Sequence, residues 1–313
     1  MLVTGGLGFI GRAVTKRLVE VGHEVVVMSR GAGPGAWRPA GPVTSVQADV
    51  RDRVRLTRLL AYHDVEAACH LAALTSDRDS FARPLEHYDI NLGGTLHLLA
   101  ALDRHARATG RPTGLAFASS GAVYGDPGTA PVPEDAPTRP VSPYGASKLA
   151  AEQAIAHQAA TGLLGAVTIR HFNAAGAAAD VRDRDVTHLI PGALAVARGA
   201  ERALRLVDET VVREFTHVTD LAESFRLAVE HTVPGRALTY NVGSGTGVTI
   251  REVLDAVEAV SGRDVPVDPD PARSGPLVQV ADSTRAQHDL RWTPEHSSLH
   301  QIVSDAWHAT YPE

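Results

Sequence analysis

Tyr144 and Lys148 stand four residues apart in the segment YGASK, a spacing that places a phenol and an ammonium group on one face of a helix. Lysine is rare in this chain, which has only Lys16 and Lys148 and otherwise carries its positive charge on arginine. A tyrosine becomes a base at neutral pH only if its pKa falls by about three units, which requires roughly 4 kcal/mol of preference for the phenolate. A nearby ammonium group can supply much of that preference. Because Pro143 is tolerated at a helix start, we expect a helix that begins near Ser142.

The segment FASSGAVYG, residues 117–125, offers a small hydroxyl group that could reach the same substrate atom as the tyrosine. Ser119 and Ser120 both stand at the end of an apolar run, residues 114–120, which predicts a strand. Open α/β sheets bind their ligands at the carboxyl ends of the strands, so either serine is a candidate. The alternative is that the serines only form a turn or a cap, and from this pair alone that alternative would be preferred.

A glycine-rich turn follows the first apolar run. The segment TGGLGFIG, residues 4–11, contains Gly6-x-Gly8-x-x-Gly11 after a predicted strand and at the start of a predicted helix. Glycines at this spacing let backbone N–H groups approach a diphosphate, and the helix N-terminus adds a partial positive charge. Because the flanking elements are correct on both sides, the motif predicts a bound dinucleotide cofactor. An oxidised nicotinamide ring would then be a second positive charge close to Tyr144.

The end of the second predicted strand bears on whether the cofactor is NAD or NADP. NAD-binding sheets usually carry a carboxylate there, whereas this chain has Ser29 followed by Arg30. Arg30, with Arg38 beyond it, could pair with a 2′-phosphate, which favours NADP; that Arg30 only faces solvent is an equally weighted alternative. Asp49, expected at the end of the third strand, could accept a hydrogen bond from the adenine amino group.

The elements that must position these residues alternate in the first half of the chain, as βαβ units of a parallel sheet do. Apolar runs predict strands, and helical patterns lie between them, so that strands are expected at 1–3, 24–28, 43–49, 66–73, 114–120, 164–170 and 239–243, and helices at 12–21, 52–62 and 90–109. Thr249 and Glu252 form a capping box at the start of a later helix. We predict an α/β fold, with a doubly wound parallel sheet (a Rossmann fold) in residues 1–172 and a smaller C-terminal substrate domain in residues 173–313, some of whose segments return to the first domain.

The composition excludes several other classes of protein. A net charge of −6 gives no reason to expect nucleic acid as a partner, and no apolar run is long enough to span a membrane. The first residues lack the pattern of a secretory signal, and the single Cys69 fits a reducing compartment, so we expect a cytoplasmic protein. His296 and His300 could share a helix face as metal ligands do, but no third ligand accompanies them, and we expect no metal.

Taken together, the motifs resemble those of the extended short-chain dehydrogenases/reductases that act on nucleotide sugars. The resemblance covers nearly the whole chain through TGGLGFIG, HLAALT, RPLEHYDINLGGTLHLL, SSGAVYGD, SPYGASKLAAEQ, IRHFNAAGA, REFTHVTDLAESF and YNVGSG. Within the family the chain is most similar to the sugar-nucleotide 4-epimerases, the group that includes UDP-galactose 4-epimerase. The 4,6-dehydratases carry an Asp-Glu pair where Gly121 and Ala122 stand here, so dehydration is disfavoured.

The resemblance implies a role for each matching residue. Ser120, Tyr144 and Lys148 would be the catalytic set, and Asn91 would support it. Around the cofactor it places Gly5, Gly8, Phe9, Ile10, Gly11, Asp49, Val50, Leu71 and Ala72, with Asn91, Tyr144, Lys148 and His171 beside them. Ser29 and Arg30 join this set because of their own position at the end of the second predicted strand. The nucleoside-diphosphate sugar would be held by Ser120, Asn173, Leu189, Arg213 and Arg273. It also implies a homodimer through the helices that begin near Tyr88 and Tyr144.

These residues together predict a nucleotide-sugar 4-epimerase that passes through a transient 4-keto sugar and uses bound NAD or NADP, with a local preference for NADP. Two alternatives remain at this point. A 4-keto-sugar reductase would use the same three residues once and consume NADPH, and the pair Ser29 and Arg30 would suit it. A dinucleotide-sensing regulator would keep the fold but would not need Tyr144 and Lys148. His171, which replaces the tyrosine common in this family, leaves the cofactor and the sugar open.

Overall fold

The computed structural model describes residues 1–31, 37, 40–128, 131–206, 208–270 and 278–309. Its centre is a seven-stranded parallel sheet in the order β3-β2-β1-β4-β5-β6-β12. The strands are β1 (Leu2–Thr4), β2 (Val25–Ser29), β3 (Val43–Gln47), β4 (Ala67–His70), β5 (Thr113–Ser120), β6 (Leu164–His171) and β12 (Ala237–Val242). The predicted doubly wound parallel sheet is therefore confirmed.

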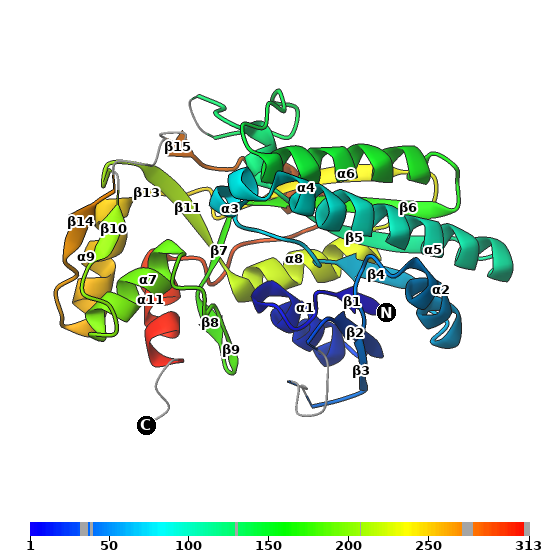
Figure 1. Ribbon diagram of the computed structural model, residues 1–313, viewed down its shortest axis with the longest axis horizontal. Helices are drawn as coiled ribbons and strands as arrows, with labels where there is room; N and C mark the ends of the chain where they lie inside the picture. The colour runs from blue at the N-terminus through cyan, green and yellow to red at the C-terminus, as the bar shows by residue number, and fades with distance from the viewer. Residues whose placement is uncertain (32–36, 38–39, 129–130, 207, 271–277, 310–313) are drawn as a thin grey trace.

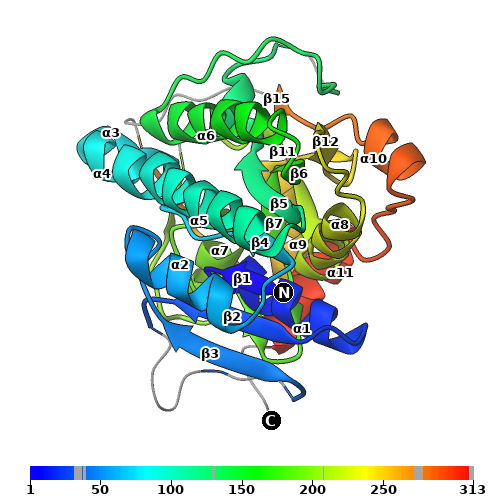
Figure 2. The same cartoon turned by 90° about the vertical axis from the view of Figure 1, so that its right-hand side faces the viewer.

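Helices cover both faces of this sheet, as Figure 2 shows. On one face lie α2 (Arg53–Tyr62), α5 (Gly94–Thr109) and α6 (Pro143–Ala159), and on the other lie α1 (Phe9–Glu20) and α8 (Val218–Glu230). Successive strand residues point to opposite faces, so that Leu2 packs in the α2–α5 core whereas Val3 packs in the α1–α8 core. Because both faces are buried, the strands are continuous apolar runs, which is why their positions could be predicted from the sequence.

A smaller body lies beyond the carboxyl ends of the strands, on the left in Figure 1. Its helices α7 (Leu189–Ala197), α9 (Ile250–Ser261) and α11 (Leu299–His308) share a core that includes Ile190, Val253 and Ile302. Its strands are β7 (Asn173–Ala175), β8 (Ala177–Ala178), β9 (Val181–Arg182), β10 (Leu204–Leu206), β11 (Val212–His217), β13 (Gly247–Thr249), β14 (Val267–Pro269) and β15 (Val278–Gln279). The predicted capping box of Thr249 and Glu252 opens α9 and is confirmed.

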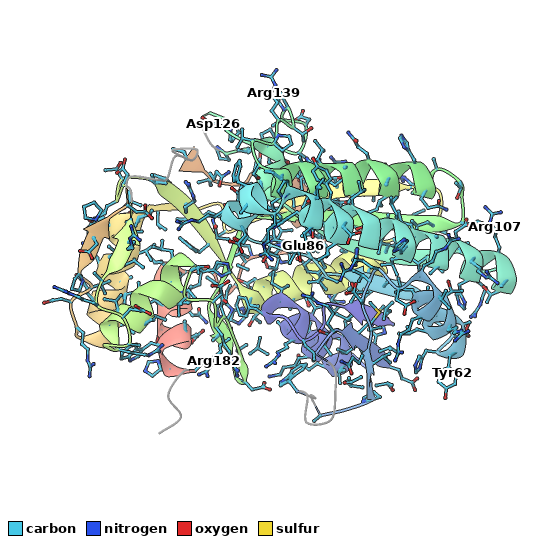
Figure 3. The ribbon with its side chains drawn as sticks, viewed as in Figure 1. Tyr62, Glu86, Arg107, Asp126, Arg139 and Arg182 are labelled. Atoms are coloured by element: carbon cyan, nitrogen blue, oxygen red, sulfur yellow. The ribbon has the colours of Figure 1, made fainter. Side chains whose placement is uncertain are left out.

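Several shorter helices lie between these longer elements in the chain. They are α3 (Asp77–Ala82), α4 (Pro84–His87), the π-helix η1 (Tyr88–Gly93), the 3-10 helix η2 (Gly121–Tyr124) and α10 (Thr284–Asp289). Tyr62 and Arg107, near the carboxyl ends of α2 and α5, lie at the opposite side of the molecule from the smaller body (Figure 3). The carboxyl ends of the strands therefore face the smaller body.

The second half of the chain contributes to the large sheet as well as to the smaller body. Strand β12 pairs with β6 in parallel, and α8 packs against β5 and β6. The division at residues 172 and 173 stays a prediction about how the chain is organised.

The surroundings of Cys69 and His296 do not indicate a cysteine nucleophile or a metal site. Cys69 is fully buried, and burial raises the pKa of its thiol to about 12, which disfavours a thiolate nucleophile. Within the described ranges, no cluster of three or more histidine, cysteine, aspartate or glutamate residues could hold a metal ion. His296 instead contacts Asp220 at 2.8 Å through its Nδ1. None of the helices in the described part of the chain is both long enough and apolar enough to cross a lipid bilayer.

Candidate active site

The carboxyl end of β5 distinguishes the two candidate serines. Ser119 is fully buried, and its hydroxyl group hydrogen-bonds to the carboxylate of Glu152 inside the protein. Ser120 ends the strand, accepts the Ala122 N–H at 3.1 Å and is hydrogen-bonded to the phenol of Tyr144. The structure thus brings Ser120, and not Ser119, to Tyr144.

Tyr144 and Lys148 occupy the first turns of α6, as the spacing predicted. The helix begins at Pro143, and the Ser142 hydroxyl caps it by accepting the Gly145 N–H at 3.1 Å. Tyr144 and Lys148 are 6% and 3% exposed, respectively. This burial makes both groups sensitive to charges that enter the site.

The protein by itself does not activate the tyrosine. Burial raises the pKa of Tyr144 to about 12, against the opposing effect of the Ser120 hydrogen bond. The Lys148 ammonium group donates to the Ala118 carbonyl oxygen at 2.8 Å and lies 5.0 Å from the centre of the Phe117 ring. Burial lowers the pKa of Lys148 to about 8, although the charge of Glu152 acts in the opposite direction. The lowered tyrosine pKa expected from the sequence therefore requires a further positive charge.

The glycine-rich turn between β1 and α1 forms a cradle that side chains would fill. Gly5 has a φ angle of +70°, and a Cβ atom there would lie 2.7 Å from the Ala72 nitrogen. A Cβ atom on Gly11 would lie 2.7 Å from the Gly6 Cα atom and closer still to the Gly5 carbonyl oxygen. The first turn of α1 contains no acidic residue. The residues present thus fit a bound anionic diphosphate at a helix N-terminus.

The other residues expected around this cradle lie near it in the fold. The Leu71 N–H donates to the Thr4 carbonyl oxygen at 3.1 Å, so β4 ends beside the glycine turn. Gly8 immediately precedes α1, Phe9 and Ile10 open that helix, and Val50 is buried three residues after β3. This place, between β1 and β4, is where the strand order reverses and where doubly wound sheets bind dinucleotides.

The end of the cradle at which the sequence predicted contacts to the cofactor ribose carries charges of both signs. Ser29 ends β2, and the exposed Arg30 follows it. Strand β3 ends at Gln47, so Asp49 stands two residues beyond the strand rather than at its end. Arg51 contacts the Asp49 carboxylate at 2.8 Å and is the main cause of its pKa of about 2, to which Arg30 adds a smaller contribution. Arg30 is thus close to a permanent carboxylate charge.

Asn91 and His171 complete the cofactor side of the site. Asn91 is 1% exposed, and its amide donates to the Leu74 carbonyl at 3.0 Å and to the Ser147 hydroxyl at 3.0 Å. Both amide hydrogens are thus used within the protein. His171 ends β6 opposite Ser120, its Nδ1 lies 2.9 Å from the Phe172 carbonyl oxygen, and burial lowers its pKa to about 4. The imidazole is therefore neutral at physiological pH.

Of the residues expected to hold the substrate, Asn173, Leu189 and Arg213 lie in the smaller body, whereas Ser120 ends β5. Asn173 lies on β7 and donates to the Glu214 carbonyl oxygen at 2.8 Å, and Arg213 lies on the neighbouring strand β11. Leu189 is the first residue of α7. Arg273 lies outside the described residues, as does Arg38. Nothing in the described contacts tests the roles that the sequence suggested for these side chains.

A buried ion pair behind α6 was not predicted from the sequence. The Arg170 guanidinium contacts the Glu152 carboxylate at 2.6 Å, and the two side chains are 9% and 8% exposed. Arg170 also donates to the Tyr124 hydroxyl at 2.9 Å. Glu152 follows Lys148 by four residues in an alanine-rich helix, and that isolated charge was the signal that could have revealed it.

Comparison with known proteins agrees with this geometry. The sequence profile of the family described as "NAD dependent epimerase/dehydratase family" matches residues 1–243. The UDP-glucose 4-epimerase of Streptomyces lividans is 39% identical over 100% of this chain and 97% of its own length. The solved structure of the UDP-glucose 4-epimerase of Stenotrophomonas maltophila, with bound NAD and formylated UDP-arabinopyranose, superposes on this chain with a TM-score of 0.88. The two sequences are 33% identical, and the match covers 98% of this chain and 96% of the other. The UDP-glucose 4-epimerase of Bifidobacterium longum, solved with NAD+ and UDP, has a TM-score of 0.88 and is 29% identical, with 98% of this chain and 96% of the other covered.

Both of these solved structures contain NAD, so the relatives do not support the preference for NADP drawn from Ser29 and Arg30. The family profile covers more than half of the chain, and the Streptomyces relative spans its whole length. The chain therefore belongs to the NAD dependent epimerase/dehydratase family, among its nucleotide-sugar 4-epimerases.

Proposed function

We propose that the protein interconverts UDP-glucose and UDP-galactose with a bound NAD. The observation that carries this proposal is the pairing of Ser120 with the Tyr144 phenol, one helical turn from Lys148 and at the same sheet edge as the glycine cradle. The uridine nucleotide is supported by the relatives, whose names and bound ligands include UDP-glucose and UDP.

Each catalytic side chain has a distinct part in this proposal. NAD, when bound, supplies the hydride acceptor and donor for the sugar C4 atom and a positive charge near Tyr144. The Tyr144 oxygen takes the proton of the 4-hydroxyl group and returns it after the 4-keto sugar has turned over. Ser120 donates a hydrogen bond to the same sugar oxygen, and Lys148 stabilises the phenolate. The pKa of about 12 keeps the tyrosine protonated until a positive charge enters the site.

The proposed cofactor contacts follow the sheet edge. Gly5, Gly8 and Gly11 would hold the diphosphate, and Leu71 and Ala72 would line the adjacent wall. Asp49 would accept a hydrogen bond from the adenine amino group, as its position beyond β3 suggests. We propose NAD rather than NADP because the related epimerases of known structure contain NAD.

We propose two arginines as the contacts to the substrate diphosphate. Arg213 and Arg273 would pair with the substrate diphosphate, since guanidinium groups match phosphate oxygens in pairs. Asn173 and Leu189 would contact the same nucleotide. The sugar would then lie between these residues and Tyr144.

We also propose a homodimer that forms through α5 and α6. In support, α3, α4, η1 and α5 expose large apolar side chains, namely Phe81, Leu85, Tyr88 and Leu96, which are 61%, 82%, 37% and 45% exposed. A cluster of this kind is typical of a surface that another protein covers. A cytoplasmic location is supported by the single buried Cys69, which forms no disulfide.

The experiment is a two-way assay of the purified protein. UDP-glucose and UDP-galactose are incubated separately with catalytic amounts of enzyme, and the products are separated by anion-exchange chromatography. The proposal predicts the other epimer in both reactions, with no lasting change at the absorbance band of reduced nicotinamide. A stoichiometric loss of added NADPH with a 4-keto sugar, and no epimer from either substrate, would instead identify a reductase. Nucleotide released from heat-denatured enzyme, identified by mass, decides between NAD and NADP.

A further inference from the structure

A row of buried hydrogen bonds connects the glycine turn with the helix of Tyr144. Its centre is His70, the last residue of β4, which is 1% exposed. Its Nδ1 lies 2.6 Å from the Thr4 Oγ1, and its Nε2 lies 3.0 Å from the Thr95 Oγ1. Thr4 immediately precedes the glycine turn, and Thr95 lies in the first turn of α5. None of these three side chains has a part in the chemistry described above.

The hydroxyl groups of Thr95 and Thr4 determine which atom donates and which accepts in each hydrogen bond of this row. The Thr95 hydroxyl donates its only proton to the Asn91 carbonyl oxygen at 2.6 Å, so it must accept from His70. The proton of the imidazole is therefore on Nε2, and Nδ1 accepts from the Thr4 hydroxyl. The Thr4 oxygen in turn accepts the Ala72 N–H at 3.3 Å. Only the neutral imidazole with its proton on Nε2 satisfies all of these partners.

The row joins the two parts of the proposed active site. At one end, Thr4 and Ala72 belong to the strand ends that flank the glycine cradle. At the other end, the Asn91 amide donates to the Ser147 hydroxyl at 3.0 Å, and that hydroxyl donates to the Tyr144 carbonyl oxygen at 2.7 Å. The row thus runs from the end of β4 through Asn91 to the helix that carries Tyr144.

The surroundings of His70 keep its imidazole neutral. Burial is the main cause that lowers its pKa to about 3, and the positive charge of Lys148 acts in the same direction. The ring also packs against Phe117, with 5.8 Å between the ring centres. A protonated imidazole would lose its acceptor for the Thr4 hydroxyl and would place a second positive charge near Lys148.

We propose that His70 is a positioning residue, which holds the cofactor-binding strand ends in register with the helix of Tyr144. The proposal rests on the proposed function of this site, since it takes the glycine cradle to be where NAD binds. His70 acts through one acceptor and one donor, so a glutamine amide, which offers both, replaces it. Leucine fills a similar space and offers neither.

The test compares NAD affinity in two pairs of variants, His70→Gln with His70→Leu and Thr95→Ser with Thr95→Val. The dissociation constant of NAD is measured by calorimetry on protein freed of nucleotide, and circular dichroism checks the fold. His70→Leu and Thr95→Val leave buried polar groups unpaired, and each should weaken NAD binding by about tenfold or more. His70→Gln and Thr95→Ser should stay within about threefold of the wild type.

Two results would overturn the proposal. One is an equal loss of affinity in the glutamine and leucine variants, which would show that His70 acts by its shape alone. The other is wild-type NAD affinity in Thr95→Val, a variant that keeps its size and so tests the row even if His70→Leu does not fold. Because NAD binding is measured without any sugar, a wild-type protein that binds NAD but forms no epimer would contradict the proposed function and leave this test valid.

Discussion

Replacing Glu152 by glutamine should show how strongly the ion pair behind the catalytic helix is coupled to stability and to Lys148. The substitution keeps the size of the side chain and removes a charge that contacts Arg170 at 2.6 Å, with both side chains less than one-tenth exposed. Removing one partner of a buried ion pair costs about 3–5 kcal/mol, because the other charge is left unpaired. Arg170 keeps its bonds to the Tyr124 hydroxyl and the Glu134 carbonyl, so we expect the lower end of this range.

A loss of about 3 kcal/mol corresponds to a fall of roughly 4–6 °C in Tm for a chain of 313 residues. The measurement is thermal unfolding followed by circular dichroism, with the double variant Glu152→Met, Arg170→Met as its matched control. In that variant neither charge remains, so at least half of the lost stability should return. A Tm within about 1 °C of the wild type for Glu152→Gln would refute the reasoning, as would a double variant less stable than either single variant.

The same substitution should change the pH dependence of activity in a defined direction. The charge of Glu152 raises the pKa of Lys148, whose value of about 8 reflects burial. In the proposed function Lys148 stabilises the phenolate only while it is protonated, so activity should fall as the pH rises through its pKa. Glu152→Gln should move this alkaline limb to lower pH, whereas Arg170→Met, which leaves the carboxylate in place, should not. A shift in the same direction for both variants would show that lost stability, and not charge, causes the effect.

Tyr144→Phe should lower kcat by at least about 100-fold with Tm and NAD affinity retained, and near-wild-type turnover would exclude the tyrosine as the acid/base group. Gly11→Ala should abolish NAD binding in calorimetry, because its Cβ atom would lie 2.7 Å from Gly6 Cα; unchanged affinity would place the diphosphate elsewhere. Lys148→Met should move the acidic limb of the pH–rate profile upward, since the phenolate loses a positive charge, and an unmoved limb would contradict this role. Leu85→Arg should turn the dimer into a monomer by light scattering, and a wild-type monomer at micromolar concentration would refute the proposed interface.

Much of the fold could be predicted from the sequence because its determinants are local. The strands are apolar runs buried on both faces, so β2 and β5 were placed within one residue of their observed starts. The capping box at Thr249 is likewise a contact between residues three apart. The short strands of the smaller body have no such signal. Strand β7, for example, exists because β11, some forty residues later, pairs with it.

The candidate site was predictable only in part, for a physical reason. The spacing of Tyr144 and Lys148 fixes their helix face but not their electrostatic state, which depends on burial by segments distant in the sequence. Only the resemblance to the 4-epimerases favoured Ser120 over Ser119 in the sequence, because the physical difference lies in their contacts with Tyr144 and Glu152. The row through His70 was hidden for the same reason, since a histidine in an apolar strand shows nothing of the threonines that bind it.

The central claim, that the C4 hydrogen leaves and returns on the same protein-bound cofactor, is tested most directly by isotope retention. UDP-glucose carrying deuterium at C4 is incubated with the enzyme in ordinary water, and the UDP-galactose formed is analysed by mass spectrometry and NMR. The account predicts that deuterium is fully retained at C4, because Tyr144 exchanges only the hydroxyl proton. Loss of the deuterium to water would contradict the account, since it would mean that C4 itself is deprotonated.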